Sequence, residues 1–539
     1  MSHLARGSEP TEVSLERPFS GFQFVEDHFA GSPPIRKLFS ISRCRQGSTL
    51  NIEHVPAEGA VAEENEDLLA TYPSFENRDI VRLSFWAPSK EPDCGAAPEK
   101  ECIGYAILKL DYVPPRGENG EFIIHSGVMK YAELWHVYEA VFSTYPHPHN
   151  YANANAVFEF RCGEKIVAIS GCLYAQQNSL NKTCAQVAIR SIASTYLGTN
   201  ALSYRRINQL AAKQSPAFDP SQGMSNAEIA TVLRDLSVNV LPLDYGELEK
   251  HTKLSDIRDI LPYQKVVYSG IESGCGALVA FKLRGPAAPD VGHVIPFFGH
   301  TFNEDAWAPT GGPAYFQYGE HIRYIPSRAW MNSFLVHDDN FGANLCIPHS
   351  FLKKKNISCV FELLPPGWVA SGAEAEVAAA DYFYSILPNL PPSDDLPWLR
   401  RLWEYVANQR LILRHVPITK EDYLTNLRNC EDWEGRKENE ETIAEFEASV
   451  SGHKFWMVEV SVPEVFPTNK NKLGEILINA SEPLSPETDG SSFVLARFPG
   501  SFVFFDSLDH NGDPSFALSP SNLRSHVSLY STCRVPDCQ

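Results

Sequence analysis

The 539-residue sequence lacks the features that mark several large classes of protein. No two cysteines stand in a CxxC pair, so the strongest signature of a structural zinc site is absent, and we expect neither a metal nor a cofactor. No apolar run approaches the roughly 20 residues that a membrane-spanning helix needs. The first residues, MSHLARGSEPTEV, also lack the apolar core of a secretory signal. We therefore expect a cytoplasmic protein with no membrane partner.

Basic residues are also scarce in this chain. It contains 46 Lys and Arg against 66 Asp and Glu, which gives a formal net charge of −20. Such a surface repels a phosphate backbone, so nucleic acid is not an expected partner. The twelve cysteines are scattered singly, without the dense spacing of a secreted disulfide framework. A hydrophobic content of 43% and an aromatic content of 11% are instead typical of a globular protein with sizeable cores.

The length of the chain requires more than one core, because single cores stop growing near roughly 250–300 residues. Short β-rich runs at Ile80–Trp86 and Ile103–Leu110 predict a strand-rich N-terminal region, whereas later segments alternate between helical and strand patterns. The sequence thus predicts the α+β class. The predicted parts are a flexible N-terminus at 1–20, a strand-rich region at 21–145, a central domain at 146–350 and a C-terminal α+β region at 351–539.

The clearest local pattern is a helix over Thr183–Leu197. Apolar residues recur there with helical spacing, and Gln186, Arg190 and Ser194 mark the opposite, polar side. Gly198 stands where a left-handed residue would end the helix. Cys184 then lies in the first turn, where the positive end of the helix dipole favours a thiolate.

Further elements follow on both sides of this helix. Ser225 and Glu228 have the spacing of a capping box and predict the start of a second helix. Apolar runs with strand character predict strands at Lys265–Tyr268, Ala277–Leu283, His293–Phe298 and Phe334–Val336. In the C-terminal region, Phe455–Val460 and Gly474–Ile478 are expected to pair as neighbouring strands.

Three segments resemble the papain-like cysteine peptidases, in particular the bacteriocin-processing type. They are Tyr174–Ser191 (YAQQNSLNKTCAQVAIRS), Gly292–Thr301 (GHVIPFFGHT) and Phe334–Gly342 (FLVHDDNFG). The first is also similar to uncharacterised bacterial proteins with a QQ…CA helix start. The resemblance covers about a third of the chain. It departs from papain itself in that Ala185-Gln186 follows the cysteine, where the family has Gly-Ser or Gly-Pro.

The resemblance implies a papain-like central domain, with the cysteine on a helix and the histidine and aspartate on an antiparallel sheet. Cys184 would be the nucleophile and His293 its base. Asp338 is the first choice as the group that orients His293, although alignment from Gly342 backwards favours Asp339. Gln177 would stabilise the oxyanion.

Two alternatives remain open for these roles. Gln176 is an alternative oxyanion donor to Gln177, and His300, one strand length away from His293, is a competing base. Each residue also has a structural interpretation, because a free cysteine on an apolar helix is usually a small core residue.

The order of these residues predicts a hydrolase or acyl transferase with a cysteine nucleophile, acting on an amide, peptide or isopeptide bond. A thiol protease is the commonest enzyme of this kind, and its partner would be a peptide or protein substrate. The alternative hypothesis is a non-catalytic binding or interaction protein that retains a papain-like scaffold, with the long flanking regions as its interaction surface.

Overall fold

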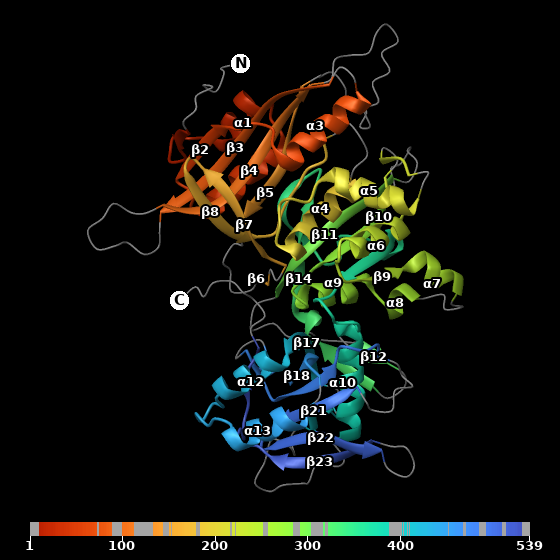
Figure 1. Cartoon of the computed structure of the whole chain (residues 1–539). Coiled ribbons are helices and arrows are strands. Elements are labelled where there is room, and N and C mark those ends of the chain that lie inside the picture. Colours follow the sequence, from red (N-terminus) through yellow and green to blue (C-terminus); the bar gives the residue numbers. More distant parts are fainter. Residues whose placement is uncertain are drawn as a thin grey trace, which may run out of the picture.

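A computed structural model shows a mixed α and β protein with mainly antiparallel sheets, as the α+β prediction requires. The N-terminal sheet lies at one end of the molecule, the central sheet in the middle and the C-terminal sheet at the other end (Figure 1). No helix within the described ranges is long and apolar enough to cross a membrane. The structure describes residues 10–72, 75–88, 100–112, 133–143, 150–151, 154–178, 184–215, 218–220, 223–251, 257–283, 291–302, 316–318, 322–386, 402, 404–406, 408, 410–450, 452–466, 470–484, 492–508 and 514–530.

The N-terminal sheet is a meander in which each strand pairs with the next along the chain. Helices α1 and α2 pack on it, and α2 begins with two prolines, which suit a first helical turn because its N–H groups lack helical partners. Within the segment 1–20, which is predicted to be flexible, Thr11–Ser14 forms a strand that pairs with β2. The elements are β1 (Thr11–Ser14), α1 (Gly21–Phe29), α2 (Pro33–Cys44), β2 (Thr49–His54), α3 (Gly59–Thr71), β3 (Glu76–Pro88), β4 (Lys100–Tyr112) and β5 (Glu133–Phe142).

The central sheet has the strand order β15-β14-β11-β10-β16-β9, with β6 beside β11. A hairpin of β7 and β8 precedes it, and its helices are α4 to α9. The elements are β6 (Asn150–Tyr151), β7 (Ala156–Cys162), β8 (Lys165–Gly171), α4 (Cys184–Leu197), α5 (Tyr204–Gln214), α6 (Asn226–Asp235), β9 (Val240–Asp244), α7 (Tyr245–His251), α8 (Ile257–Ile260), α9 (Tyr263–Glu272), β10 (Ala277–Leu283), β11 (Val291–Phe302), β14 (Met331–Asp338), β15 (Gly342–Pro348) and β16 (Ile357–Leu363), with 3₁₀ turns at Ser327–Trp330 and Lys354–Asn356.

Most of the local predictions for this region hold. Gly198 has a left-handed φ of 64°, Ser225 and Glu228 form the expected capping box, and the three strand predictions from Ala277 onwards fall within β10, β11 and β14. Thr183, the expected first helical residue, lies outside the described residues. The predicted strand at Lys265–Tyr268 is wrong, because this segment belongs to α9. A short apolar run fits a buried helix as well as a strand, and here the helical pattern continues on both sides.

The predicted boundary at residue 351 cuts through the central sheet. Strand β16 comes after that residue, yet it pairs with β10 on one side and β9 on the other. Conversely, β12 (Phe316–Tyr318) and β13 (Ile322–Pro326) belong to the C-terminal sheet, where β13 runs parallel to β17. The chain therefore exchanges strands between the two sheets.

The C-terminal sheet has the order β12-β13-β17-β18-β20-β21-β22-β23. The expected pairing of Phe455–Val460 with Gly474–Ile478 is confirmed by the register of β18 and β20. Helix α10 packs on β17, β18 and β20. The elements are α10 (Gly372–Ile386), β17 (Ile412–Thr419), α12 (Lys420–Asn429), α13 (Glu440–Ser449), β18 (Lys454–Ser461), β19 (Asn471–Lys472), β20 (Gly474–Asn479), β21 (Phe493–Phe498), β22 (Ser501–Leu508), β23 (Pro514–Pro520) and β24 (Val527–Ser528), the last of which pairs with β19.

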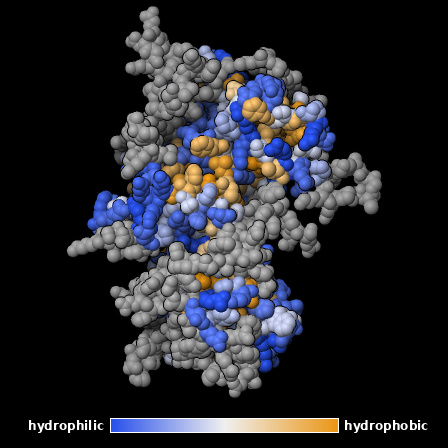
Figure 2. Space-filling model, turned by 180° about the vertical axis from the view of Figure 1, so that it is seen from behind, coloured by the Kyte–Doolittle hydropathy of each residue, from blue (hydrophilic) through white to orange (hydrophobic). Residues whose placement is uncertain are grey.

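The N-terminal and central parts share one hydrophobic core. Tyr105 and Val141 of the N-terminal sheet belong to the same buried cluster as Ile189 of α4, Leu278 of β10 and Phe361 of β16. On the rear of the molecule, apolar residues gather toward the middle and are bordered by hydrophilic ones (Figure 2). Because the removal of apolar surface from water drives the packing of this shared core, the N-terminal and central parts are expected to fold as one body.

Buried ion pairs connect the central and C-terminal sheets. Arg414 of β17 donates to Glu272 of α9 and to Glu459 of β18, at 3.0 Å in each case. His300 of β11 lies 2.6 Å from the other oxygen of Glu272, and Lys472 donates to Glu459 at 2.7 Å. Burial alone would raise the pKa of Glu272, but Arg414 and His300 outweigh it and lower that pKa to about 2. Arg414 thus neutralises carboxylates from both sheets.

We predict that Arg414→Met lowers the free energy of unfolding by about 3–5 kcal/mol, because the two buried carboxylates Glu272 and Glu459 lose the cation that they share. Denaturant unfolding followed by tryptophan fluorescence measures this change. The matched control is Arg428→Met, since Arg428 forms its ion pairs at the surface, and its effect should stay within about 0.5 kcal/mol. Equal effects of the two variants would show that the buried connection does not hold the sheets together.

Candidate active site

Cys184 is the first residue of α4, and its side chain is partly exposed. The side chain of Cys184 is one of the groups that raise the pKa of His293, and its sulfur lies 4.0 Å from the carbonyl oxygen of Gly292. The first N–H groups of a helix have no partner within the helix, so they favour negative charge beside them. The sulfur therefore lies at the start of a helix and beside an imidazole.

From Ala185 to Thr195, α4 is buried on all sides, which differs from the amphipathic helix that the sequence predicts. Gln186, Arg190 and Ser194, the expected polar side, are each 0% exposed. Arg190 reaches β5, where it donates to Glu139 at 2.6 Å and to the carbonyl of Tyr138 at 2.8 Å. Arg190 thus faces the N-terminal sheet, where its charge is paired. This packing fixes the axis of the helix that carries Cys184.

His293 lies near the start of β11, opposite Phe281 of β10, and is 6% exposed. Its Nε2 atom is 3.4 Å from Oδ2 of Asp338 and 3.4 Å from Oδ1 of Asp339. Burial disfavours the imidazolium, but the hydrogen bonds with Asp338 and Cys184 and the two carboxylate charges outweigh it and raise the pKa of His293 to about 10. At neutral pH the ring is therefore a cation between a thiol and two carboxyl groups.

The structure places both candidate aspartates beside His293. A register shift between β14 and β15 at Val336/Asp338 interrupts the alternation of side chains at the strand end, so consecutive residues reach the same ring. Burial would raise the pKa of Asp338, but His293 and the backbone N–H groups of Asn340 and Phe341 lower it. For Asp339, burial dominates and raises the pKa to about 6. Asp338 is therefore the better fixed and more fully ionised of the two.

The two glutamines differ in what they contact. Gln176 accepts from the N–H of Val137 at 3.0 Å through its side chain, which ties it to β5. The amide of Gln177 donates to Oδ1 of Asn340 at 2.7 Å, beside the turn that carries the two aspartates. A side-chain amide has two hydrogens, so Gln177 retains one for another acceptor. Of the two, Gln177 is the one adjacent to the candidate site.

The competing base, His300, is elsewhere and is already engaged. It is fully buried against Glu272, at the end of β11 that faces the C-terminal sheet. His300 thus belongs to the charge network that connects the sheets, whereas His293 at the opposite end of the strand faces Cys184.

His337 is a neighbour of the site that sequence analysis did not single out. Its Nδ1 accepts from the N–H of Asn344 at 3.1 Å, so its Nε2 carries the hydrogen and donates to the carbonyl of Cys172 at 3.3 Å. Burial lowers the pKa of His337 to about 3, which keeps the ring neutral. It holds the segment before Gln176 against β14. The only sequence signal for a role of His337 was its position directly before Asp338, because a histidine within a strand has no distinctive spacing.

His293, Asp338 and Asp339 could also hold a metal ion, since one donor atom from each lies within 4.8 Å of the others. Imidazole and carboxylate are ligands that zinc and other divalent metals accept. A metal on Nε2 would take the place of the proton there. No metal is expected from the sequence, whereas the fold brings these three donor atoms together.

Comparison with known proteins gives no family assignment: no model of a protein family matches the chain, and no curated protein matches it. The interpretation of the site therefore depends on the geometry of these residues.

The raised pKa of His293 leads to a direct prediction. The folded pKa lies above the ordinary value of about 6.5, so the imidazolium persists through neutral pH and loses its proton only near pH 10. A histidine-selective NMR titration should show this transition, and Asp338→Asn should move it to lower pH because one carboxylate charge is lost. His251, which is exposed, provides the internal reference. A His293 transition near pH 6.5 would contradict the ion-pair geometry.

Proposed function

We propose that the chain is a cysteine-nucleophile hydrolase or acyl transferase that acts on an amide, peptide or isopeptide bond, with a peptidase as the first expectation. The single observation that carries this proposal is the placement of His293 between the thiol of Cys184 and the carboxylate of Asp338. A nucleophile, a base within hydrogen-bonding reach and an orienting group on the far side of the base are what nucleophilic acyl transfer needs.

In the proposed reaction the Cys184 thiolate attacks the carbonyl carbon, which forms a C–S bond and places negative charge on the carbonyl oxygen. The protonated His293 gives its proton to the leaving nitrogen as the C–N bond breaks. Water then attacks the thioester while His293 takes a proton from it, and the thiolate leaves. Asp338 holds the ring and stabilises its charge throughout these steps.

The oxyanion is the group that needs donors in this scheme. The backbone N–H of Cys184 lies at the start of α4, where the helix leaves it without a helical partner. Gln177 would supply the second donor from the segment that precedes the helix. Preorganised donors of this kind typically contribute about 10²–10³ in rate.

A papain-like fold for the central part belongs to the same proposal. Its support is the placement of the cysteine at the start of a helix, which packs against the strand that carries His293. Asp338 ends the neighbouring antiparallel strand, β14, and Asp339 follows it. The alternative, a non-catalytic scaffold, would leave Cys184 with ordinary thiol reactivity.

We predict that iodoacetamide alkylates Cys184 faster than any other cysteine at pH 7, because an adjacent imidazolium maintains the thiolate. His293→Gln should slow alkylation of Cys184 by about 100-fold, at the lower end of what a positioned base contributes. Peptide mapping by mass spectrometry gives the rate for each cysteine. Cys44 and Cys346 are exposed in the structure and serve as internal standards.

The matched control for His293→Gln is His251→Gln, at an exposed position on α7. It should leave every alkylation rate unchanged. If Cys184 reacts no faster than Cys44 and Cys346, the non-catalytic alternative replaces the proposed function.

Removal of bound metal distinguishes the proposed acyl transfer from a metal-dependent reaction at His293, Asp338 and Asp339. We predict that dialysis against a chelator leaves the alkylation rate of Cys184 within about twofold, since the proposed steps involve only the thiol, the imidazole and a carboxylate. Metal content before and after dialysis is measured by elemental mass spectrometry. One equivalent of a tightly held metal that Asp339→Asn abolishes would show instead that His293 and the aspartates are its ligands.

A further inference from the structure

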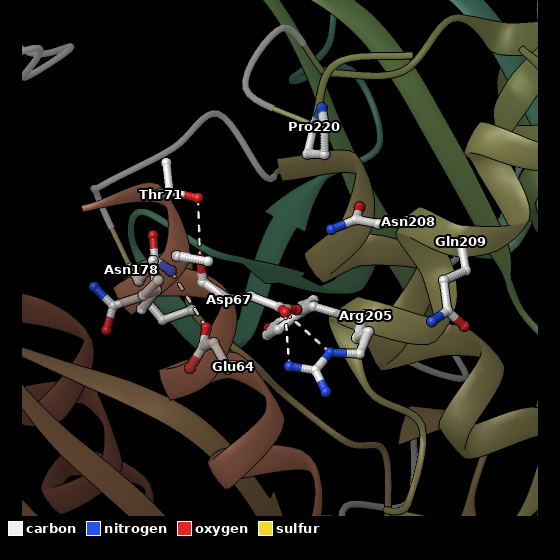
Figure 3. A pocket seen from close by; sticks show the side chains of 12 residues that line it. Glu64, Asp67, Thr71, Asn178, Arg205, Asn208, Gln209 and Pro220 are labelled. Atoms are coloured by element: carbon white, nitrogen blue, oxygen red, sulfur yellow. Dashed lines mark hydrogen bonds and ion pairs between the residues drawn. The ribbon is translucent and has the colours of Figure 1, made fainter. Parts of the chain in front are cut away.

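A pocket of about 400 Å³ lies between the C-terminal half of α3 and the first turns of α5. Figure 3 shows Glu64, Asp67 and Thr71 of α3 on one side of it, with Asn208 and Gln209 of α5 across from them. It thus opens where the N-terminal part meets the central part. Its lining comprises Glu64, Asp67, Leu68, Ala70, Thr71, Gln176, Asn178, Tyr204, Arg205, Asn208, Gln209 and Pro220.

Two short connections join this pocket to the candidate active site. Gln186, two residues beyond Cys184 on α4, contacts Oδ1 of Asn208 and the carbonyl of Pro220, each at 3.4 Å. On the other side, Gln176 and Asn178 line the pocket and flank Gln177, whose amide bonds to Asn340 beside the aspartates. Residues that line the pocket, or contact its lining, thus lie two positions from Cys184 and on both sides of Gln177.

The inner wall of the pocket carries a buried carboxylate. Glu64 is 6% exposed, accepts from the amide of Asn178 at 3.3 Å and pairs with Lys109. Burial would raise the pKa of Glu64, but Lys109, His136 and Arg190 lower it. The group therefore stays ionised inside the protein, and its hydrogen bonds fix its orientation toward Asn178 and Lys109.

The mouth of the pocket has an excess of negative charge. Arg205 is shared between Asp67 at 2.7 Å and Glu66 at 3.0 Å, so one guanidinium faces two carboxylates. The last carbonyl groups of α3, near Thr71, add the negative end of the helix dipole. A cation entering here would meet carboxylates on the α3 side and amide oxygens on the α5 side.

We propose that this pocket binds the ammonium or guanidinium group of a basic residue in a peptide or protein substrate of Cys184. The proposal deepens the proposed function and rests on it. The side-chain amides of Asn208 and Gln209 carry donor and acceptor atoms for the peptide groups on either side of that residue.

The test uses three synthetic pentapeptides, acetyl-Ala-Ala-X-Ala-Ala-amide, in which X is lysine, norleucine or glutamate. Direct binding to the full chain is measured by titration calorimetry. Protection is measured as the peptide concentration that halves the rate at which iodoacetamide alkylates Cys184, relative to the rate for the same variant without peptide. We expect the lysine peptide to bind at least about fivefold more tightly than the norleucine peptide, the size of a partly screened ion pair, and to protect Cys184.

Two variants locate the effect in the pocket. Asp67→Asn removes one carboxylate from the pocket. Thr71→Lys adds a lysine ammonium group at the exposed end of α3, where it would compete with the cation of the peptide. Both should abolish the preference for lysine over norleucine. Their matched controls are Asp422→Asn and Thr425→Lys, at exposed positions on α12, which should retain it.

Each outcome decides between the alternatives. No preference for lysine, a preference for glutamate, or a preference that survives in both pocket variants would overturn the assigned ligand class. Binding of the lysine peptide without protection of Cys184 would show that the pocket does not serve the thiol. Failure of Cys184 to react selectively in the absence of any peptide would instead refute the proposed function, and the subsite with it.

Discussion

The burial of α4 on all sides from Ala185 to Thr195 is the constraint on which the candidate site depends. One side of the helix packs against β11 of the central sheet, and the other is held through the ion pair of Arg190 with Glu139 of β5. With both sides fixed, the helix start cannot move relative to His293 without exposing a buried guanidinium. The cost of an unpaired buried charge is several kcal/mol, so Cys184 stays near the imidazole. The N-terminal sheet thus contributes to the site although it supplies none of the proposed catalytic residues.

Local signals in the sequence predict much of the central part. Gly198, the Ser225–Glu228 capping box and the strand at Ala277–Leu283 are each determined by neighbouring residues, and the structure has them where the pattern places them. Cys184, His293, Asp338 and Asp339 are predicted together from their order along the chain, and the structure brings them within reach of one another. Asp338 and Asp339 could not be distinguished because strand register depends on the bulge at the end of β14, which no local pattern encodes.

What the sequence could not predict is non-local. Arg190 has the spacing of a solvent-facing residue, and only the packing of β5 over that side of α4 makes it a buried one. Strand β16 lies more than 70 residues from β10 along the chain, yet it pairs between β10 and β9, so a boundary drawn from local composition misses it. The pocket beside α3 has the same origin, since its walls come from segments that only the fold brings together.

Transient acylation of Cys184 tests the central claim most directly. Incubation with p-nitrophenyl acetate should transfer one acetyl group to the Cys184 sulfur, with release of p-nitrophenol, and the thioester should then hydrolyse with turnover that depends on His293. Intact-protein and peptide mass spectrometry identify the modified residue at successive times. The account predicts acetylation confined to Cys184 and loss of turnover in Cys184→Ala and His293→Gln. Acetyl groups spread over exposed nucleophiles, or hydrolysis that continues unchanged in Cys184→Ala, would contradict it.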